Sequence, residues 1–372
     1  MRTVFINGKF TAQRTTGVQR SARCIVLALD RWLSSVTPVA DGVHWVLLCP
    51  LNAVVPELRH IEVRKVGWRA AQNLHFWEQV VLPLVARGTV LLNLAGAAPL
   101  FKRRQVCTFH DAAVFDCPEA FTPAFGAWYR FVFRHIARRT RLLLTVSVFS
   151  KSRLTACLGI SPARVAVMHG SGDHMLSVRS DQATLPRLGL QPQGYFVAVG
   201  SSNPTKNFRA LLAAFAGLPA RCDAQLVIVG GTNDAVFASE PRPVDGERIV
   251  RAGAASDEEL KALYESALGL VFPSVYEGFG LPPLEAMRCG CPVAASTAAS
   301  IPEACGEAAL YFDPHSPAAI GAAMMRLFDE PELRQQLRTR GAKHVQDFGW
   351  EAAARVLIQH LGTSDRTIPA DR

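Results

Sequence analysis

The sequence predicts an α/β protein with two doubly wound domains, each built on a parallel sheet. Short apolar runs, of the kind that parallel sheets bury on both faces, recur along the chain between stretches with helical spacing. At 372 residues the chain is too long for one ordinary core, and residues 177–193 contain the Ser, Asp, Gln and Pro typical of a linker. We therefore expect one domain over residues 1–180 and a second over residues 190–345.

The composition is that of a globular protein, because 49% of the residues are apolar and 19% are charged. No run of about twenty apolar residues occurs, so we expect no membrane-spanning helix, and the apolar run at the N-terminus is too short for a signal peptide. The nine cysteines lack the paired C-x2-C spacing of zinc sites. We expect no metal site, and reduced thiols as in a cytoplasmic protein.

The formal net charge of +9 is concentrated in the first half of the chain. Residues 1–180 contain 23 Lys and Arg against 9 Asp and Glu, whereas the remainder contains 17 against 22. This asymmetry predicts an anionic partner for the first domain. Because no nucleic-acid-binding motif is found, a membrane surface or an anionic lipid carrier is favoured over nucleic acid.

A stretch that mixes aromatic and basic residues, Thr122–Arg141, lies in this half. Its arginines recur at three- and four-residue spacing, which makes a basic stripe on a helix: Arg130, Arg134, Arg138 and Arg141. Two interpretations remain open. Either the helix lies at a membrane interface, or its apolar side packs on the core and its basic side faces solvent.

The first domain begins with an expected strand at Thr3–Ile6, a loop, and a helix that starts near Gly17. This order is that of a phosphate-binding loop, although one glycine is a weak signal. A histidine at the end of a strand, His110, faces the edge where ligands bind, but a His-Asp pair is more often structural. Ser150 is a candidate N-cap of the helix after the fifth strand. Further strands are expected at His44–Cys49, Thr89–Leu94, Val106–Asp111, Leu142–Ser147 and Val165–Met168.

The second domain opens with an expected strand at Tyr195–Val199, a polar loop, and a helix over 208–216. Gly200 and Ser201 follow the strand, and Lys206 and Asn207 stand at the helix start. By geometry this is a phosphate site, in which Lys206 offsets the charge of a diphosphate without a metal. Buried strands are also expected at Ala224–Val229, Leu268–Phe272, Cys291–Ser296 and Leu310–Phe312, and Ser256–Glu259 forms a capping box.

Two carboxylates eight positions apart, Glu277 and Glu285, flank a turn that follows the strand Leu268–Phe272. Gly278 and Gly280 let backbone N–H groups approach a ligand closely, and the prolines after Leu281 open a helix that carries Glu285. Two isolated glutamates are usually solvated surface acids. The block of acid, two glycines, aromatic residue, two prolines and second acid favours a ligand site instead.

This block resembles the E-x7-E signature of retaining glycosyltransferases of family 4, which have the GT-B fold. The resemblance implies two Rossmann-like domains that face one another across a cleft, with a last helix at 350–362 that returns to the first domain. It also implies that Glu285 binds ribose hydroxyls, Glu277 binds the transferred sugar, and Lys206 stabilises the leaving diphosphate. It further implies that His110 contacts the sugar from the first domain. The implied donor-binding positions are Gly17, Gly200, Ser201, Lys206, Asn207, Glu277, Gly278, Phe279, Gly280, Leu281 and Glu285.

By this resemblance the protein transfers a hexose, with retention, from a nucleotide sugar to a saccharide or polyprenyl-diphosphate-linked acceptor in surface-polysaccharide synthesis. GDP-mannose is the favoured donor, no cofactor is needed, and no D-x-D metal motif is present. Many relatives have an arginine where Ser201 stands, so one cation of the site is absent or supplied elsewhere. We expect the enzyme in the cytoplasm, peripherally at the inner face of the membrane.

Two alternatives remain open: a phosphorylase-like enzyme of the same architecture, and a degenerate glycan-binding protein that keeps the fold. A dehydrogenase is disfavoured, because no G-x-G-x-x-G follows a strand.

Overall fold

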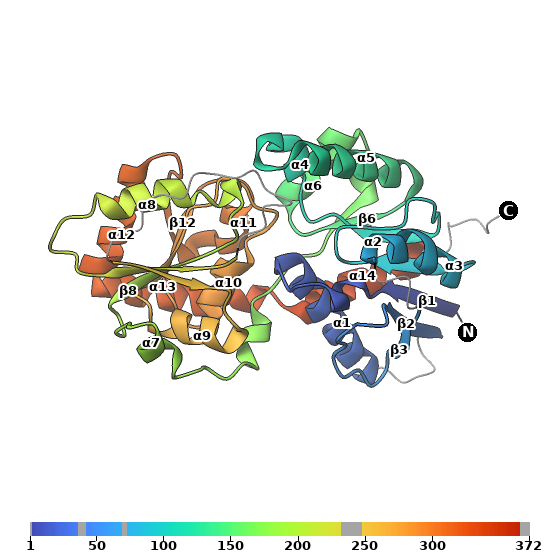
Figure 1. The fold of residues 1–372 in the computed structure, drawn as a ribbon, viewed down its shortest axis with the longest axis horizontal. Helices are drawn as coiled ribbons and strands as arrows, with labels where there is room; N and C mark the ends of the chain where they lie inside the picture. Colours follow the sequence, from blue (N-terminus) through green and yellow to red (C-terminus); the bar gives the residue numbers. More distant parts are fainter. Residues whose placement is uncertain (1, 36–41, 69–72, 232–247, 365–372) are drawn as a thin grey trace. The chain divides into compact units, whose positions relative to one another are not determined.

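The chain forms two compact units in a computed structural model, which describes residues 2–35, 42–68, 73–231 and 248–364 (Figure 1). Unit 1 consists of Met1–Ala112, Trp128–Gly170 and Trp350–Arg372. Unit 2 consists of Ala113–Ala127 and Ser171–Gly349. Each unit contains one sheet whose strands are all parallel, as the sequence predicts.

The sheet of unit 1 has seven strands in the order β3-β2-β1-β4-β5-β6-β7. The strands are β1 Arg2–Asn7, β2 Val43–Cys49, β3 Glu62–Lys65, β4 Val90–Asn93, β5 Gln105–Thr108, β6 Leu143–Thr145 and β7 Val165–Val167. Its helices are α1 Gly17–Ser35, α2 Leu74–Phe76, α3 Leu82–Val85, α6 Val148–Leu158 and α14 Trp350–Ser364, and α5 Pro123–Arg139 begins in unit 2 and continues into unit 1.

The last helix completes unit 1, where α14 packs against α1 (Figure 1). Its inner face is fully apolar, with Trp350, Ala354 and Leu357 buried. On α1, Ile25 and Leu29 are buried. Because the two helices are in contact, the apolar core of unit 1 includes residues from the end of the chain.

A buried polar network lies below the carboxyl ends of β1 and β4. Lys9 Nζ contacts Glu78 Oε2 at 2.7 Å, and both side chains are almost fully buried. The Asn7 amide donates to Glu78 Oε1 and to Asn93 Oδ1, and the Asn93 amide donates to Gln105 Oε1. A π-helical turn at Trp77–Val81, between α2 and α3, carries Glu78. The charge of each ion is thus balanced inside the unit.

The sheet of unit 2 has six strands in the order β10-β9-β8-β11-β12-β13. The strands are β8 Tyr195–Val199, β9 Gln225–Val229, β10 Ile249–Gly253, β11 Gly269–Phe272, β12 Val293–Ser296 and β13 Ala309–Phe312. The helices are α4 Ala113–Asp116, α7 Thr184–Arg187, α8 Phe208–Ala216, α9 Asp257–Ser266, α10 Leu281–Arg288, α11 Ile301–Cys305, α12 Pro317–Asp329 and α13 Pro331–His344. Figure 1 shows α8 on one face of this sheet and α9 on the other.

Several local expectations need correction. The strand β3 was not predicted, because its sequence Glu-Val-Arg-Lys is charged and exposed at the sheet edge. Ser147, not Ser150, is the N-cap of α6, and its hydroxyl accepts from the Ser150 N–H. The helix α5 ends at Arg139, so Arg141 does not continue its basic stripe. The capping box of Ser256 and Glu259 at α9 is confirmed.

All nine cysteines are free thiols. Burial raises the pKa of Cys107, Cys291 and Cys305 to about 12, so these thiols stay protonated and unreactive at neutral pH. Within the described residues no helix has both the length and the apolar character needed to cross a bilayer.

Candidate functional site

The adjacent strands β8 and β11 end at the same edge of the unit 2 sheet, and each is followed by a loop with predicted site residues. After β8 the chain passes Gly200 and Ser201 to a 3₁₀ turn at Pro204–Lys206. After β11 it reaches Glu277 and then α10. Carboxyl edges of parallel sheets are where α/β proteins bind ligands.

Lys206 and Glu277 form an ion pair at this edge. Lys206 Nζ lies 2.6 Å from Glu277 Oε1, and the two side chains are 20% and 12% exposed. The ammonium also lies 5.9 Å from the centre of the Phe272 ring. A Cβ at Gly200 would approach Lys206 Cγ to 3.1 Å, so the glycine leaves room for the lysine stem. A cation beside a carboxylate suits a ligand that carries both phosphate and hydroxyl groups.

Asn207 ties three loops of the site together. It adopts a left-handed conformation with φ of 56°, and its amide donates to the carbonyl oxygens of Pro273 and Pro314 at 3.1 and 2.7 Å. These prolines follow β11 and β13. Both amide hydrogens are therefore engaged by the protein, and only the side-chain oxygen remains for a ligand.

Two serines that the sequence did not single out hold the loop around Glu277. The buried Ser300 hydroxyl lies 2.9 and 3.0 Å from the carbonyl oxygens of Glu277 and Phe279 and shares its one hydrogen between them. The Ser296 hydroxyl donates to the Ser274 carbonyl at 2.6 Å. Fixing these carbonyl groups fixes the peptide planes of the loop, and with them the direction of its N–H groups.

The turn from Gly278 to Leu281 carries the chain into α10. Gly280 has φ of 114°, a conformation open to glycine and strained for other residues. The Phe279 side chain is 4% exposed and packs on the Phe348 ring, with 5.7 Å between centroids. A ligand at this turn therefore meets backbone N–H groups and not the Phe279 ring.

Glu285 is 4% exposed, and two neighbours orient its carboxylate. His174 Nε2 lies 3.1 Å from Oε1, and the Tyr264 hydroxyl donates to Oε2 at 3.3 Å. Burial, and then the negative charge of Glu285, raise the pKa of Tyr264, so its phenol stays protonated and keeps donating. His174 and Tyr264 were not predicted, because nothing in their local sequence indicates a contact with Glu285.

Two predicted site residues, His110 and Gly17, belong to unit 1. His110 Nε2 lies 2.9 Å from the Leu94 carbonyl oxygen, and the His110 carbonyl accepts from the Ser150 hydroxyl at 3.2 Å. Burial lowers the pKa of His110, so the imidazole is neutral at pH 7. Because Nε2 donates to the carbonyl, Nδ1 is left as an acceptor. Gly17 is the exposed first residue of α1.

Comparison with known proteins identifies relatives over most of the chain. A family model described as Glycosyl transferases group 1 matches residues 186–344. The O-antigen chain mannosyltransferase B of Escherichia coli is 33% identical over 256 residues, which cover 67% of this chain and 67% of that protein. The O-antigen chain mannosyltransferase RfbU of Salmonella typhimurium is 28% identical over 249 residues, or 66% of this chain and 67% of that protein.

Solved structures match the fold over nearly the whole chain. Sucrose-phosphate synthase from Thermosynechococcus elongatus has a TM-score of 0.72 at 19% identity, covering 99% of this chain and all of that one. HepE from Anabaena, in complex with UDP-glucose, has a TM-score of 0.69 at 15% identity, covering 98% of this chain and all of that one. At such identities the likeness concerns the fold alone, which is GT-B. From the sequence relatives, the chain belongs to the group 1 glycosyl transferases.

Proposed function

We propose that this protein is a mannosyltransferase of surface-polysaccharide synthesis, which transfers mannose from GDP-mannose to a saccharide acceptor. The observation that carries the proposal is the Lys206–Glu277 pair at the carboxyl edge of the unit 2 sheet. Two relatives named O-antigen mannosyltransferases support the sugar and the process. A structural neighbour was solved with UDP-glucose, which supports a nucleotide sugar as the donor.

In this proposal each group of the site has one task. Lys206 stays beside Glu277 and stabilises the charge of the diphosphate as the sugar departs, in place of a metal ion. Glu277 and the amides of Phe279 and Gly280 hold hydroxyls of the transferred sugar. Glu285 accepts hydrogen bonds from the ribose, and His110 contacts the sugar. No second carboxylate is assigned as a nucleophile: the acceptor oxygen bonds to the anomeric carbon on the leaving-group side while the bond to the diphosphate breaks, its proton passes to the departing phosphate oxygen, and the configuration is retained.

A panel of nucleotide sugars tests the proposal, with binding followed by isothermal titration and turnover followed with and without EDTA. We expect selective binding of GDP-mannose and turnover that EDTA leaves unchanged. Glu285→Gln keeps the volume of the side chain but removes the charge that accepts from ribose, so donor affinity is expected to fall roughly tenfold to a hundredfold. Glu332→Ala changes an exposed acid of α13 and is the matched control.

Two outcomes would contradict parts of this proposal. If no donor binds, the degenerate glycan-binding alternative is favoured, with Ser201 in place of a cation as the first residue to examine. If EDTA abolishes turnover and Mg²⁺ or Mn²⁺ restores it, Lys206 does not replace a metal.

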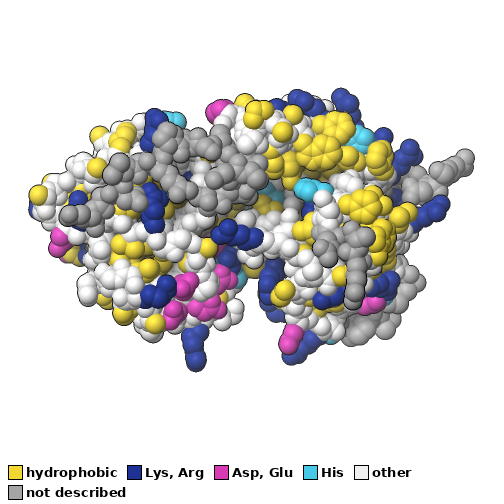
Figure 2. All heavy atoms as spheres, viewed as in Figure 1, with side chains coloured by type: hydrophobic (Ala, Val, Ile, Leu, Met, Phe, Trp, Pro, Cys, Tyr) yellow, Lys and Arg dark blue, Asp and Glu magenta, His cyan; other side chains and the backbone are white. Residues whose placement is uncertain are grey.

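An exposed apolar face on unit 1 supports a second part of the proposal, contact with a membrane. Of the large hydrophobic side chains exposed among the described residues, all but Leu176 belong to unit 1. Figure 2 shows apolar side chains gathered over α2, α3 and α5. We name this surface the apolar face; its members are Trp68, Phe76, Val80, Leu84, Val85, Phe101, Trp128 and Phe131.

The helix α5 packs part of its surface on the core of unit 1 and exposes aromatic and basic side chains elsewhere. Val132, Phe133 and Ile136 are buried in the core of unit 1. Trp128 and Phe131 are 45% and 51% exposed, and their rings lie 5.9 Å apart. Exposed arginines lie on the same helix. Aromatic side chains beside cations suit the interface of an anionic bilayer, where a lipid-linked acceptor would be found.

We expect the protein to sediment with vesicles that contain phosphatidylglycerol and not with pure phosphatidylcholine. The variant replaces four arginines by glutamine: Arg130, Arg134, Arg138 and Arg141. It is expected to bind these vesicles at least tenfold more weakly, since each basic residue near a membrane surface contributes about 1 kcal/mol. A control with the same change of charge replaces four exposed basic residues of unit 2 by glutamine: Arg179, Arg209, Arg340 and Lys343. Unchanged sedimentation and activity in the fourfold variant would exclude the membrane contact.

A further inference from the structure

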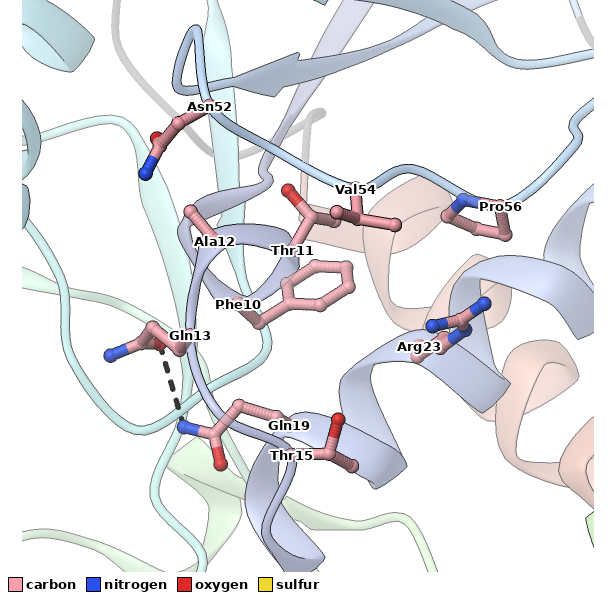
Figure 3. A pocket seen from close by; sticks show the side chains of 10 residues that line it. All are labelled: Phe10, Thr11, Ala12, Gln13, Thr15, Gln19, Arg23, Asn52, Val54 and Pro56. Atoms are coloured by element: carbon pink, nitrogen blue, oxygen red, sulfur yellow. Dashed lines mark hydrogen bonds between the residues drawn. The ribbon is translucent and has the colours of Figure 1, made fainter. Parts of the chain in front are cut away.

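A pocket of about 310 Å³ opens in unit 1 (Figure 3), and none of the residues that line it has a task in the proposed transfer, although Thr15 and Gln19 flank the predicted donor-binding position Gly17. It lies between the loop that follows β1, the first turns of α1, and the loop that follows β2. The volume is at the small end of the range for ligand pockets, about 300–1,000 Å³, and suits a single sugar-sized group. The pocket is therefore a candidate binding site that the proposed chemistry does not use.

The polar side chains of the pocket are neutral with one exception. Gln13, Gln19 and Asn52 bring three carboxamides to it, and Arg23 brings the single charge (Figure 3). No acidic side chain lines the pocket, which argues against a cation as the ligand. One exposed arginine provides too little positive charge to bind a diphosphate. Carboxamides both donate and accept, as sugar hydroxyls do.

An apolar wall completes the pocket. The Phe10 ring lies at its centre in Figure 3, with Val54 and Pro56 beside it. Phe10 is 4% exposed, so its position is set by the core of unit 1. A wall of this kind fits the C–H face of a pyranose ring, whereas the carboxamides reach its hydroxyl rim. This pairing of an apolar wall with neutral amides indicates an uncharged sugar.

Some polar side chains of the pocket are held by hydrogen bonds within the protein, and others are left to bind a ligand. The Gln19 amide donates to Gln13 Oε1 at 3.4 Å, and the Thr16 N–H donates to Gln19 Oε1 at 3.2 Å, so the loop and the helix hold one another. The side chains of Thr15, Arg23 and Asn52 make no hydrogen bond or ion pair with any described residue. A ligand at these groups displaces water without breaking a contact of the protein.

The pocket is too far from His110 to hold the sugar that is transferred. In the sheet order β2-β1-β4-β5, the pocket lies over β1 and β2, whereas His110 follows β5. Neighbouring strands are about 4.8 Å apart, so the separation is on the order of 10–15 Å. A single sugar ring does not span this distance, but a short chain of sugars does.

We propose that this pocket is a distal acceptor subsite, which binds a neutral sugar of an oligosaccharide acceptor at least one unit away from the hydroxyl that is glycosylated. The inference rests on the proposed function, since it takes His110 to lie beside the sugar that is transferred. It predicts an enzyme that extends an existing glycan and uses single sugars poorly.

The test compares mannose with α-linked mannobiose, mannotriose and mannotetraose as acceptors, with GDP-mannose as the donor. We expect the wild-type KM to fall at least tenfold as the acceptor grows long enough to reach the pocket. In Asn52→Ala and Gln13→Ala the KM for mannotetraose is expected to rise about tenfold, since each variant removes an amide contact. The KM for mannose and the hydrolysis of the donor are expected to stay unchanged. Gln336→Ala, an exposed carboxamide of α13, is the matched control.

A KM that does not depend on acceptor length, or variants that weaken mannose and mannotetraose equally, would overturn the subsite. A binding measurement keeps this result separate from the proposed function. Saturation-transfer NMR with mannotetraose and no donor is expected to give a signal with the wild type that Asn52→Ala loses. If the signal survives in the variant, the subsite is excluded. If it is lost but no nucleotide sugar is turned over, the subsite stands and the mannosyltransferase proposal fails.

Discussion

Lys206→Ala is expected to lower the turnover of the nucleotide sugar roughly 10²–10³-fold, the loss that follows removal of one group that stabilises developing charge. The ammonium is held in place by Glu277 and by the stem that passes Gly200, so it is positioned before the donor binds. Alanine leaves the carboxylate of Glu277 without this cation and leaves the departing diphosphate without its neutralising charge. Steady-state turnover and titration with the donor measure the two effects separately.

Two further variants decide what the lysine does. Lys343→Ala removes an exposed lysine of α13 and is expected to keep full turnover, which controls for net charge. Glu277→Gln is expected to lower turnover by a smaller factor in the Lys206→Ala variant than in the wild type, because the two side chains act as one unit. Turnover of Lys206→Ala within a factor of five of the wild type would show that the diphosphate is neutralised by another group.

Glu78→Ala is expected to reduce the free energy of unfolding by about 3–5 kcal/mol, the range for breaking a buried ion pair from one side. The substitution leaves the ammonium of Lys9, whose side chain is 6% exposed, without its counter-charge. It also removes an acceptor of the Asn7 amide. Urea denaturation followed by tryptophan fluorescence measures the change, since Trp77 is buried next to Glu78.

The control for this prediction is an acid at the surface. Glu62 contacts His44 and Arg64, and its side chain is 40% exposed, so Glu62→Ala is expected to leave the denaturation midpoint almost unchanged. The double variant Lys9→Met/Glu78→Leu removes both charges and is expected to recover most of the lost stability. A double variant as unstable as Glu78→Ala would mean that packing, and not the unpaired ammonium, determines the loss.

The sequence predicts the parts of this protein that depend on local pattern. Apolar runs identify most strands, and a loop after a strand places Lys206 and Glu277 at a sheet edge. Neither motif indicates that β8 and β11 are neighbours, because the order of strands in the sheet is set by how the helices cross over it. The edge strand β3 escaped prediction because its exposed residues need no apolar pattern.

The supporting residues of the site could not be predicted for a related reason. Ser300, His174 and Tyr264 act through contacts made only after the chain has folded, and serine or tyrosine on a helix or loop has many ordinary uses. The ion pair of Lys9 and Glu78 could not be predicted for the same reason. Charged residues are mostly exposed, and a buried pair becomes recognisable only when both partners are seen together.

The position of α14 has a consequence for the way the chain is made. A ribosome releases the whole of β1 to β7 before it begins Ser171–Gly349, and it synthesises α14 only afterwards. At 5–20 residues per second, the delay is roughly ten to forty seconds. During that time the part of α1 that contacts α14 has no permanent cover. We therefore expect the nascent N-terminal unit to keep apolar surface exposed until α14 has been made, although it is the first to emerge.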